Sequence, residues 1–264
     1  MNLKLQGKTA FITGSTSGIG WATARALAQE GVHVILNGRG AVGVSTAVEK
    51  LRKEFNEVEV KGVAVDFLYP DQIKALLGQL SEVDILINNV GIYSSASFTK
   101  TSDEDWYRQI EVNLMSGVRL SKYVLPKMLH RDWGRILFIS SECATLVPED
   151  LIAYSTTKAA LLSLSRGISQ LTSGSGVTVN TIVPGSTLTK GAEEFLATVA
   201  AKENKTKAAV SKAFFNDARK SSLLQRFAEV KEIADTITYF SSPLSSATNG
   251  AVIKVDGGSM GGIL

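Results

Sequence analysis

Apolar and polar positions follow two patterns that alternate along the whole chain: short apolar runs and longer amphipathic segments. Short runs that are apolar at consecutive positions predict strands of a sheet that is covered on both faces. Seven such runs occur, at Thr9–Thr13, Val32–Asn37, Val58–Val65, Asp84–Asn88, Arg135–Ser140, Val177–Val183 and Val252–Val255.

Amphipathic segments of helical length separate these runs. They are Ile19–Glu30, Ala41–Glu54, Asp71–Leu80, Asp103–His130, Tyr154–Leu171 and Val230–Ser241. Strand, helix and strand in repeated succession predict an α/β fold, with a parallel, doubly wound sheet of seven strands flanked by helices. Because no linker, repeat or low-complexity stretch interrupts the succession, residues 1–264 are expected to form a single domain.

The alternation stops over Thr189–Leu224, where an Ala- and Lys-rich stretch intervenes before the last helix. A long excursion at this place in an α/β fold is usually a functional lid or a surface helix pair. We therefore expect residues 188–224 to form a helical lid segment. Its apolar side chains either line a substrate pocket or seat the segment on the body; they are Phe195, Leu196, Val199, Phe214 and Phe215.

Composition and charge exclude several classes of protein. The formal net charge is +3, and the basic residues are scattered, so no nucleic-acid partner is expected. No apolar run approaches the roughly 18 residues of a membrane span, and the first residues lack the apolar core of a signal peptide. Cys143 is the only cysteine, and His33 and His130 have no partner at ligand spacing. These features predict a cytoplasmic protein without a membrane segment, an internal disulfide or a metal.

A glycine-rich turn follows the first predicted strand. Gly14, Gly18 and Gly20 stand in a G-x-x-x-G-x-G spacing at the start of a predicted helix. Glycines let the backbone pass close to a pyrophosphate, and amides at the start of a helix attract its negative charge. A tight turn without a ligand is the alternative, but the position within a strand-helix-strand unit favours a dinucleotide site.

The ends of the next strands refine the choice of nucleotide. An NAD site usually has an acid at the end of the second strand, where this chain reads Asn37, Gly38 and Arg39. Arg39 can hold a 2′-phosphate, so NADP(H) is preferred, with NAD(H) as the other possibility. Asp66 either accepts a hydrogen bond from the adenine amino group or caps a turn. Asn88–Gly91 is expected to admit the ribose at the sheet edge.

Tyr154 and Lys158 lie one helical turn apart and therefore share a helix face. Lowering a tyrosine pKa from 10 to 7 requires roughly 4 kcal/mol. An ammonium about 4 Å away supplies energy of that order at an effective dielectric constant of about 20. Ser141 ends the fifth strand, where its hydroxyl can position a substrate oxygen. Asn113, inside a long helix, can bind a water and carry protons from Lys158 to solvent.

Together these motifs resemble the short-chain dehydrogenase/reductase family over nearly the whole chain, from Gly7 to Gly258. Thr13–Gly20 is similar to TGxxxGxG, and Tyr154–Lys158 is similar to YxxxK. Asn88–Gly91 is similar to NNAG, with Val90 in place of the alanine. The resemblance implies a Rossmann-type fold and a catalytic tetrad of Asn113, Ser141, Tyr154 and Lys158.

The resemblance also implies contacts with the cofactor along the sheet edge, and a homotetramer or homodimer that pairs through the long helices. The cofactor contacts expected from the motifs and the resemblance together are Gly14, Ser15, Thr16, Ser17, Gly18, Ile19, Gly20, Asn37, Arg39, Asp66, Phe67, Asn89, Val90, Gly91, Tyr154, Lys158, Pro184, Gly185, Thr187 and Thr189.

The hypothesis from the sequence is an NADP(H)-dependent oxidoreductase that acts on a small carbonyl or secondary alcohol, with Tyr154 as general acid and base. Two alternatives stay open: an enoyl-type reductase, and a non-catalytic NADP-binding regulator that senses redox state. The substrate itself does not follow from the motifs.

Overall fold

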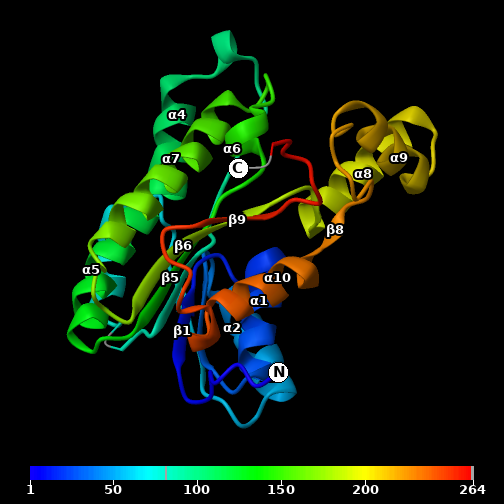
Figure 1. The fold of residues 1–264 in the computed structure, drawn as a ribbon. Helices are drawn as coiled ribbons and strands as arrows, with labels where there is room; N and C mark the ends of the chain where they lie inside the picture. Colours follow the sequence, from blue (N-terminus) through cyan, green and yellow to red (C-terminus); the bar gives the residue numbers. More distant parts are fainter. Residues whose placement is uncertain (81, 263–264) are drawn as a thin grey trace.

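A parallel sheet of seven strands forms the centre of the molecule (Figure 1). The structure is a computed structural model that describes residues 1–80 and 82–262. The strand order is β3-β2-β1-β4-β5-β6-β9. The strands are β1 (Thr9–Ile12), β2 (His33–Gly38), β3 (Val60–Ala64), β4 (Ile85–Asn88), β5 (Gly134–Ile139), β6 (Val177–Pro184) and β9 (Val252–Val255). Each predicted run forms one of them, so the predicted fold class is confirmed.

Helices cover both faces of the sheet, in three layers. One face carries α1 (Gly18–Gln29), α2 (Ala41–Glu54) and α10 (Val230–Phe240), and the other carries α3 (Pro70–Leu77), α5 (Ser116–His130) and α7 (Ile152–Gln170).

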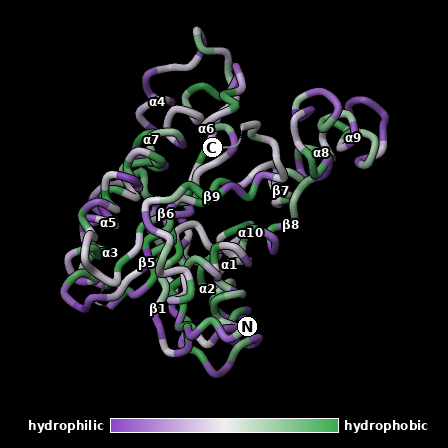
Figure 2. Tube along the Cα trace, in the orientation of Figure 1, coloured by the Kyte–Doolittle hydropathy of each residue, from purple (hydrophilic) through white to green (hydrophobic). Residues whose placement is uncertain are grey.

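Side chains that follow each other in β1 belong to different cores. Ile12 packs with the first group of helices, whereas Phe11 packs with the second. Successive side chains of a strand point to opposite faces, so a central strand must be apolar throughout. The hydropathy colouring shows the strands as apolar segments between more polar helices (Figure 2).

The segment predicted as one helix over Asp103–His130 is helical throughout, but its winding changes at its centre. It consists of α4 (Asp103–Gln109), a π-helical turn η2 (Ile110–Met115) and α5. A π-helical turn holds one more residue than an α-helical turn, and such turns are frequent at functional sites. The predicted helix is therefore present, and its centre, where Asn113 lies, is wound as a π-helix.

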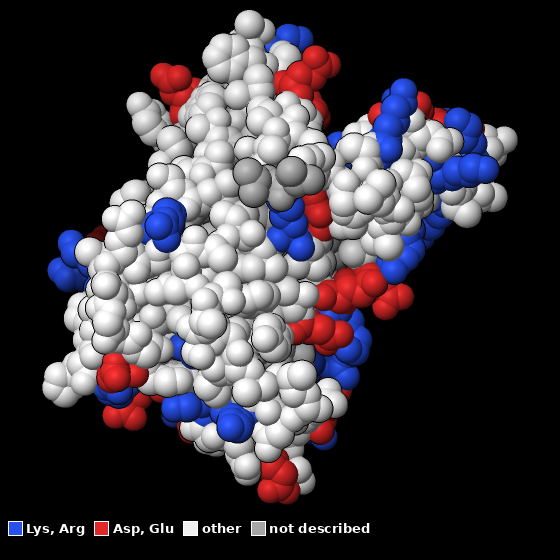
Figure 3. All heavy atoms as spheres, viewed as in Figure 1, with Lys and Arg blue, Asp and Glu red and all other residues white. Residues whose placement is uncertain are grey.

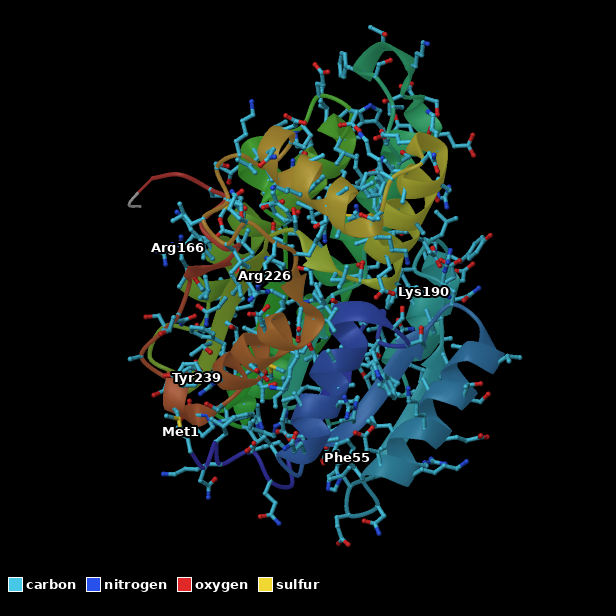
Figure 4. The ribbon with its side chains drawn as sticks, turned by 90° about the vertical axis from the view of Figure 1, so that its right-hand side faces the viewer. Met1, Phe55, Arg166, Lys190, Arg226 and Tyr239 are labelled. Carbon is cyan, nitrogen blue, oxygen red and sulfur yellow. The ribbon has the colours of Figure 1, made fainter. Side chains whose placement is uncertain are left out.

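Two helices project from the body where the alternation of the sequence stops (Figure 1). α8 (Lys190–Glu203) and α9 (Lys207–Asp217) pack on each other through Leu196, Ala200 and Val210. The segment joins the body through a two-stranded sheet, β7 (Thr187–Leu188) with β8 (Ala228–Glu229). Figure 4 labels Lys190 at the start of α8 and Arg226 shortly before β8.

The sequence did not predict β7 and β8, because two-residue strands carry no periodicity. It also did not predict the short helical turns η1 (Phe98–Lys100), α6 (Cys143–Leu146) and η3 (Pro243–Ser245).

The aromatic side chains of the projecting segment pack on one another. Phe214 stacks on Phe227, with ring centroids 5.1 Å apart, and meets Phe195 and Phe215 edge-on. These phenylalanines therefore contact one another and Phe227, an arrangement that differs from both alternatives expected from the sequence.

Charged side chains are spread over the surface without one continuous basic patch on the face that Figure 3 shows. Across residues 1–80 and 82–262, no helix combines the length and the apolar character that a membrane span requires.

Removal of a central aromatic side chain should destabilise the whole sheet. Phe138 in β5 is fully buried, and Phe138→Ala is expected to lower the free energy of unfolding by about 3–5 kcal/mol, because it leaves a cavity. Phe98→Ala is the control, since Phe98 is 60% exposed; a change within about 0.5 kcal/mol is expected. Urea denaturation followed by circular dichroism measures both. Equal effects of the two substitutions would contradict this description of the core.

Candidate active site

The turn after β1 has a backbone that suits glycine. Gly14 and Gly18 have φ values of +60° and +59°, which side chains disfavour. A Cβ atom on Gly20 would lie 2.5 Å from the carbonyl oxygen of Gly14. A side chain at position 20 would therefore prevent α1 from packing this closely against the turn.

Asn37, at the end of β2, holds this turn in place. Its Oδ1 accepts a hydrogen bond from the Gly14 amide at 2.9 Å, and its carbonyl accepts one from the Ser15 amide at 2.8 Å. The Asn37 side-chain amide donates to the carbonyls of Val63 and Val65. The Ser15 hydroxyl donates to the Ile12 carbonyl, and both residues are buried. Ser15 and Asn37, predicted as cofactor contacts, thus use their side chains to support the turn.

A second set of hydrogen bonds joins the ends of β1 and β4. The amides of Asn89 and Val90 both donate to the Thr13 hydroxyl at 2.9 Å. The Asn89 side chain donates back to the carbonyls of Thr13 and Gly14, at 2.8 and 3.0 Å. The strand order reverses between β1 and β4, and such a switch point is where doubly wound sheets bind ligands.

A hollow of about 280 Å³ opens beside this turn. Asp66 borders it and also caps a turn, since its Oδ1 accepts from the Leu68 amide at 3.0 Å. Arg39 borders the hollow from the end of β2, and Arg108 borders it from α4. The residues that line it are Gly14, Thr16, Ser17, Asn37, Gly38, Arg39, Val65, Asp66, Phe67, Leu68, Asn89, Val90, Gly91, Ile92, Arg108 and Val112.

The start of α1 borders both hollows, since Ser17 lines the first and Ile19 lines a second one. Ser17, the residue before the helix, makes no side-chain cap, and no acidic residue occupies the first turn. The first amides of a helix carry a partial positive charge and bind anions such as phosphates. Together with the glycine turn and two arginines, this donor set fits a phosphate-bearing dinucleotide.

A second hollow, of about 310 Å³, adjoins the first and shares Asn89 and Gly91 with it. It brings Ser141, Tyr154 and Lys158 together from the end of β5 and from α7. Its lining residues are Ile19, Asn89, Gly91, Tyr93, Ile139, Ser140, Ser141, Tyr154, Lys158, Pro184, Gly185, Thr187 and Thr189.

Tyr154 lines this hollow beside Ser141. Burial raises the pKa of Tyr154 above its ordinary value, and a hydrogen bond with the Ser141 hydroxyl opposes the rise. The ring of Tyr93 meets the Tyr154 ring edge-on at 5.9 Å. The phenol is therefore held in its protonated form at neutral pH.

Lys158 is 3% exposed, and its ammonium donates to the Ile139 carbonyl at 2.9 Å. Burial lowers its pKa to about 8, so it is charged at neutral pH. The ammonium lies 5.7 Å from the centroid of the Tyr154 ring. Burial is the largest influence on the pKa of Tyr154, and Lys158 is not among the groups that shift it. The expected lowering of the Tyr154 pKa by Lys158 therefore stays a prediction.

Asn113 supports the wall between the two hollows. Its side chain bonds to both backbone groups of Ile92, at 2.8 and 2.9 Å, and donates to the Thr157 hydroxyl at 3.0 Å. A Cβ atom on Gly91 would lie 3.1 Å from the Lys158 ammonium and 3.7 Å from the Asn113 Oδ1. Asn113 thus stands behind Gly91 and is not among the residues that line either hollow.

Most of the residues predicted to contact a cofactor line one of the two hollows. Three do not: Ser15, Gly18 and Gly20 shape the turn instead. The sequence analysis missed Arg108, which lies five residues before Asn113. Arg108 lies in α4, before the π-helical turn that contains Asn113, and no motif marks it, so only the fold shows that it lines the hollow. The other residues it missed are Gly38, Val65, Leu68, Ile92, Tyr93, Ile139, Ser140 and Val112.

Comparison with known proteins identifies the family. Residues 8–200 match the short chain dehydrogenase family. This chain belongs to the short-chain dehydrogenase family. This chain is 44% identical over 258 residues to the uncharacterized oxidoreductase YvaG of Bacillus subtilis, with 98% of each chain covered. It is 31% identical over 262 residues to the 3-oxoacyl-[acyl-carrier-protein] reductase FabG of Aquifex aeolicus, covering 98% of this chain and 99% of the other.

A solved structure resembles this short-chain dehydrogenase along its full length. L-sorbose reductase from Gluconobacter frateurii, complexed with NADPH and L-sorbose, matches it with a TM-score of 0.94, 30% sequence identity and 100% coverage of both chains. The protein is therefore an NAD(P)-dependent oxidoreductase of this family, and the predicted class of enzyme is confirmed.

The depressed pKa of Lys158 predicts a pH-dependent gain in stability when the ammonium is removed. Below pH 8 the lysine is charged in both the folded and the unfolded states, so the folded state bears the full cost of burying it. Lys158→Met should then raise the free energy of unfolding at pH 7 by up to ~3 kcal/mol. The gain should shrink as pH rises from 8 toward 10.5, because the folded wild-type lysine is already neutral there. Urea titrations from pH 6 to 10 measure this slope, and a difference that does not change with pH would contradict the burial of a charged lysine.

Proposed function

We propose that the protein uses NADP(H) to reduce a carbonyl group of a small polar molecule to a secondary alcohol, with Tyr154 as the proton donor. The observation that carries the proposal is the shared wall of the two hollows. Ser141, Tyr154 and Lys158 line one hollow, the glycine turn lines the other, and Asn89 and Gly91 line both. A dinucleotide in the first hollow can therefore reach the hydroxyl groups in the second.

The residues that would hold the cofactor follow from the linings. Thr16, Ser17 and the first amides of α1 would bind its phosphates, and Asp66 would face the adenine. Arg39 is exposed at the end of β2, and the strand end holds no acid that would repel a 2′-phosphate. Arg108 adds a second positive charge to the same hollow. When bound, the nicotinamide ring supplies the hydride.

The chain's own residues handle the proton. Tyr154 is protonated at neutral pH, as a phenol with an ordinary pKa is and as burial further favours, so a proton is present for transfer to a carbonyl oxygen. Ser141 is a hydrogen-bond partner of Tyr154 and can hold the same oxygen. After the transfer, the charged Lys158 stabilises the tyrosinate across the hollow.

The lining of the second hollow supports a polar substrate. Hydroxyl groups of Ser141, Tyr93, Thr187 and Thr189 border it, whereas the phenylalanines of the α8–α9 segment pack among themselves. The aromatic residues of that segment therefore give no support for an apolar substrate. The full-length structural match to an L-sorbose reductase supports a hydroxylated ketone. The α8–α9 segment stays proposed as the lid over this hollow, in one domain with the rest of the chain. The homotetramer or homodimer and the cytoplasmic location stay predictions.

Tyr154→Phe removes the proton donor and keeps the ring. Its kcat for a reducible ketone is expected to fall by at least about 100-fold, since positioned proton transfer contributes that much or more. The Kd for NADPH, measured by fluorescence titration, should change less than about threefold. Tyr107→Phe is the control, because Tyr107 is 70% exposed. Near-normal turnover of Tyr154→Phe would remove the mechanism.

Arg39→Asp should reverse the cofactor preference. Loss of a charge-assisted hydrogen bond and gain of a repelling carboxylate are expected to weaken NADPH binding at least about tenfold, while NADH binding is kept or improved. Lys53→Asp makes the same change of charge on an exposed part of α2 outside the hollow. It should leave the ratio of the Kd values for NADPH and NADH unchanged. Titration of each variant with both cofactors decides, and an unaltered ratio for Arg39→Asp would contradict the proposed 2′-phosphate site.

A substrate screen separates the alternatives. NADPH oxidation is followed with ketoses, simple ketones, acyl thioesters and enoyl thioesters, beside NADH. Activity on hydroxylated ketones supports the proposal, whereas activity confined to enoyl compounds supports an enoyl reductase. Tight NADPH binding without turnover of any of these compounds would favour the redox-sensing regulator instead.

A further inference from the structure

A buried ion pair joins the end of the α8–α9 segment to the residue that follows Ser141. The Arg219 Nε lies 2.7 Å from the Glu142 Oε1. The Glu142 side chain is 3% exposed and that of Arg219 is 13% exposed. The pair therefore lies inside the protein, beside the candidate active site.

Glu142 also binds the chain segment that follows β6. Its amide donates to the Pro184 carbonyl at 2.9 Å, and the Ser186 hydroxyl donates to its Oε1 at 2.8 Å. Pro184 lines the second hollow. One carboxylate thus connects the ends of β5 and β6 with the guanidinium of Arg219.

Arg219 contacts both sides of the junction. On the body side, its Nη2 lies 3.8 Å from the sulfur of Cys143, whose amide donates to the Ser141 hydroxyl at 3.1 Å. On the side of the projecting segment, its guanidinium lies 5.5 Å from the ring centroid of Phe214. The aromatic core of α8 and α9 is therefore linked through one side chain to the surroundings of Ser141.

Stability alone does not account for such a pair. Burying two charges removes them from water, and apolar side chains of similar size stabilise a protein equally well or better. The Glu142 Oε2 is buried without a hydrogen-bond partner among the described residues, which adds to this cost. A charged pair does, however, fix distance and direction between two elements, which apolar contacts do not.

The remaining attachment of the segment is narrow. β7 and β8 are two residues each, and the amides of Leu223 and Leu224 donate to the Gly257 carbonyl. These contacts hold the base of the segment. The pair of Glu142 and Arg219 reaches from there to the strand end that carries Ser141.

We infer that Glu142 and Arg219 are positioning residues: they hold the α8–α9 segment in place over the carbonyl substrate and thereby set the KM for that substrate. The effect on KM rests on the proposed function, whereas the effect on the position of the segment does not.

A double-mutant cycle with Glu142→Gln, Arg219→Gln and the double variant tests the pair. Glutamine at position 142 keeps an acceptor for Ser186. Each single variant is expected to raise the KM for the carbonyl substrate about tenfold, with kcat and the Kd for NADPH changed less than about threefold. The double variant should resemble a single variant, because the second change breaks a contact that is already lost.

Arg226 and Glu232 provide a matched control pair, with side chains 50% and 43% exposed. They join the chain just after this segment to α10, but at the surface, where an ion pair contributes little. Arg226→Gln and Glu232→Gln should leave the KM unchanged. A rise in KM for these variants equal to that for Glu142→Gln would overturn the assignment to the buried pair.

Hydrogen exchange of amides 190–217 provides a readout that does not depend on turnover. Glu142→Gln should speed exchange in this range at least about threefold relative to wild type, while exchange in β4 and β5 stays unchanged. If the wild type reduces no carbonyl, the proposed function fails and this measurement still decides the inference. Unchanged exchange, or additive KM effects in the cycle, overturns it. If Arg219→Gln does not fold, Arg219→Lys replaces it and should give a smaller change in the same direction.

Discussion

The hydrogen bonds between Thr13 and Asn89 fix the distance between the ends of β1 and β4, and the candidate site is built around that distance. One threonine hydroxyl accepts from two successive amides, and the asparagine side chain returns two bonds to the turn after β1. All of these groups lie where the strand order reverses, so the helices that follow the two strands leave on opposite faces. The glycine turn and the wall shared by the hollows both depend on this junction.

Burial then sets the chemistry of the side chains at that edge. It raises the pKa of Tyr154 and lowers that of Lys158, so the phenol keeps its proton while the ammonium is close to losing its own. The two shifts have the same origin, because low polarity disfavours the charged form of each group. A proton donor and a cation within one hollow can stabilise negative charge as it develops on a substrate oxygen.

Local patterns in the sequence predicted the sheet and most of the helices, because strands buried on both faces must be apolar at every position. The catalytic candidates also followed from local spacing, since Tyr154 and Lys158 lie on one helix face. Contacts between distant residues did not follow. Arg219 and Glu142 are 77 residues apart, and neither has a neighbour in the sequence that marks it. The direction of the Tyr154 pKa shift required knowledge of burial, which a motif does not contain.

The π-helical turn over Ile110–Met115 lies within the long helix over Asp103–His130 and affects where the residues of α4 lie relative to α5. An extra residue in a regular α-helix would turn everything upstream by ~100° about the helix axis. A π-helical turn takes up such a residue within about one revolution, so the helix upstream keeps its direction. With α5 seated on the sheet, the extra residue is thus accommodated while Arg108 stays at the wall of the nucleotide hollow.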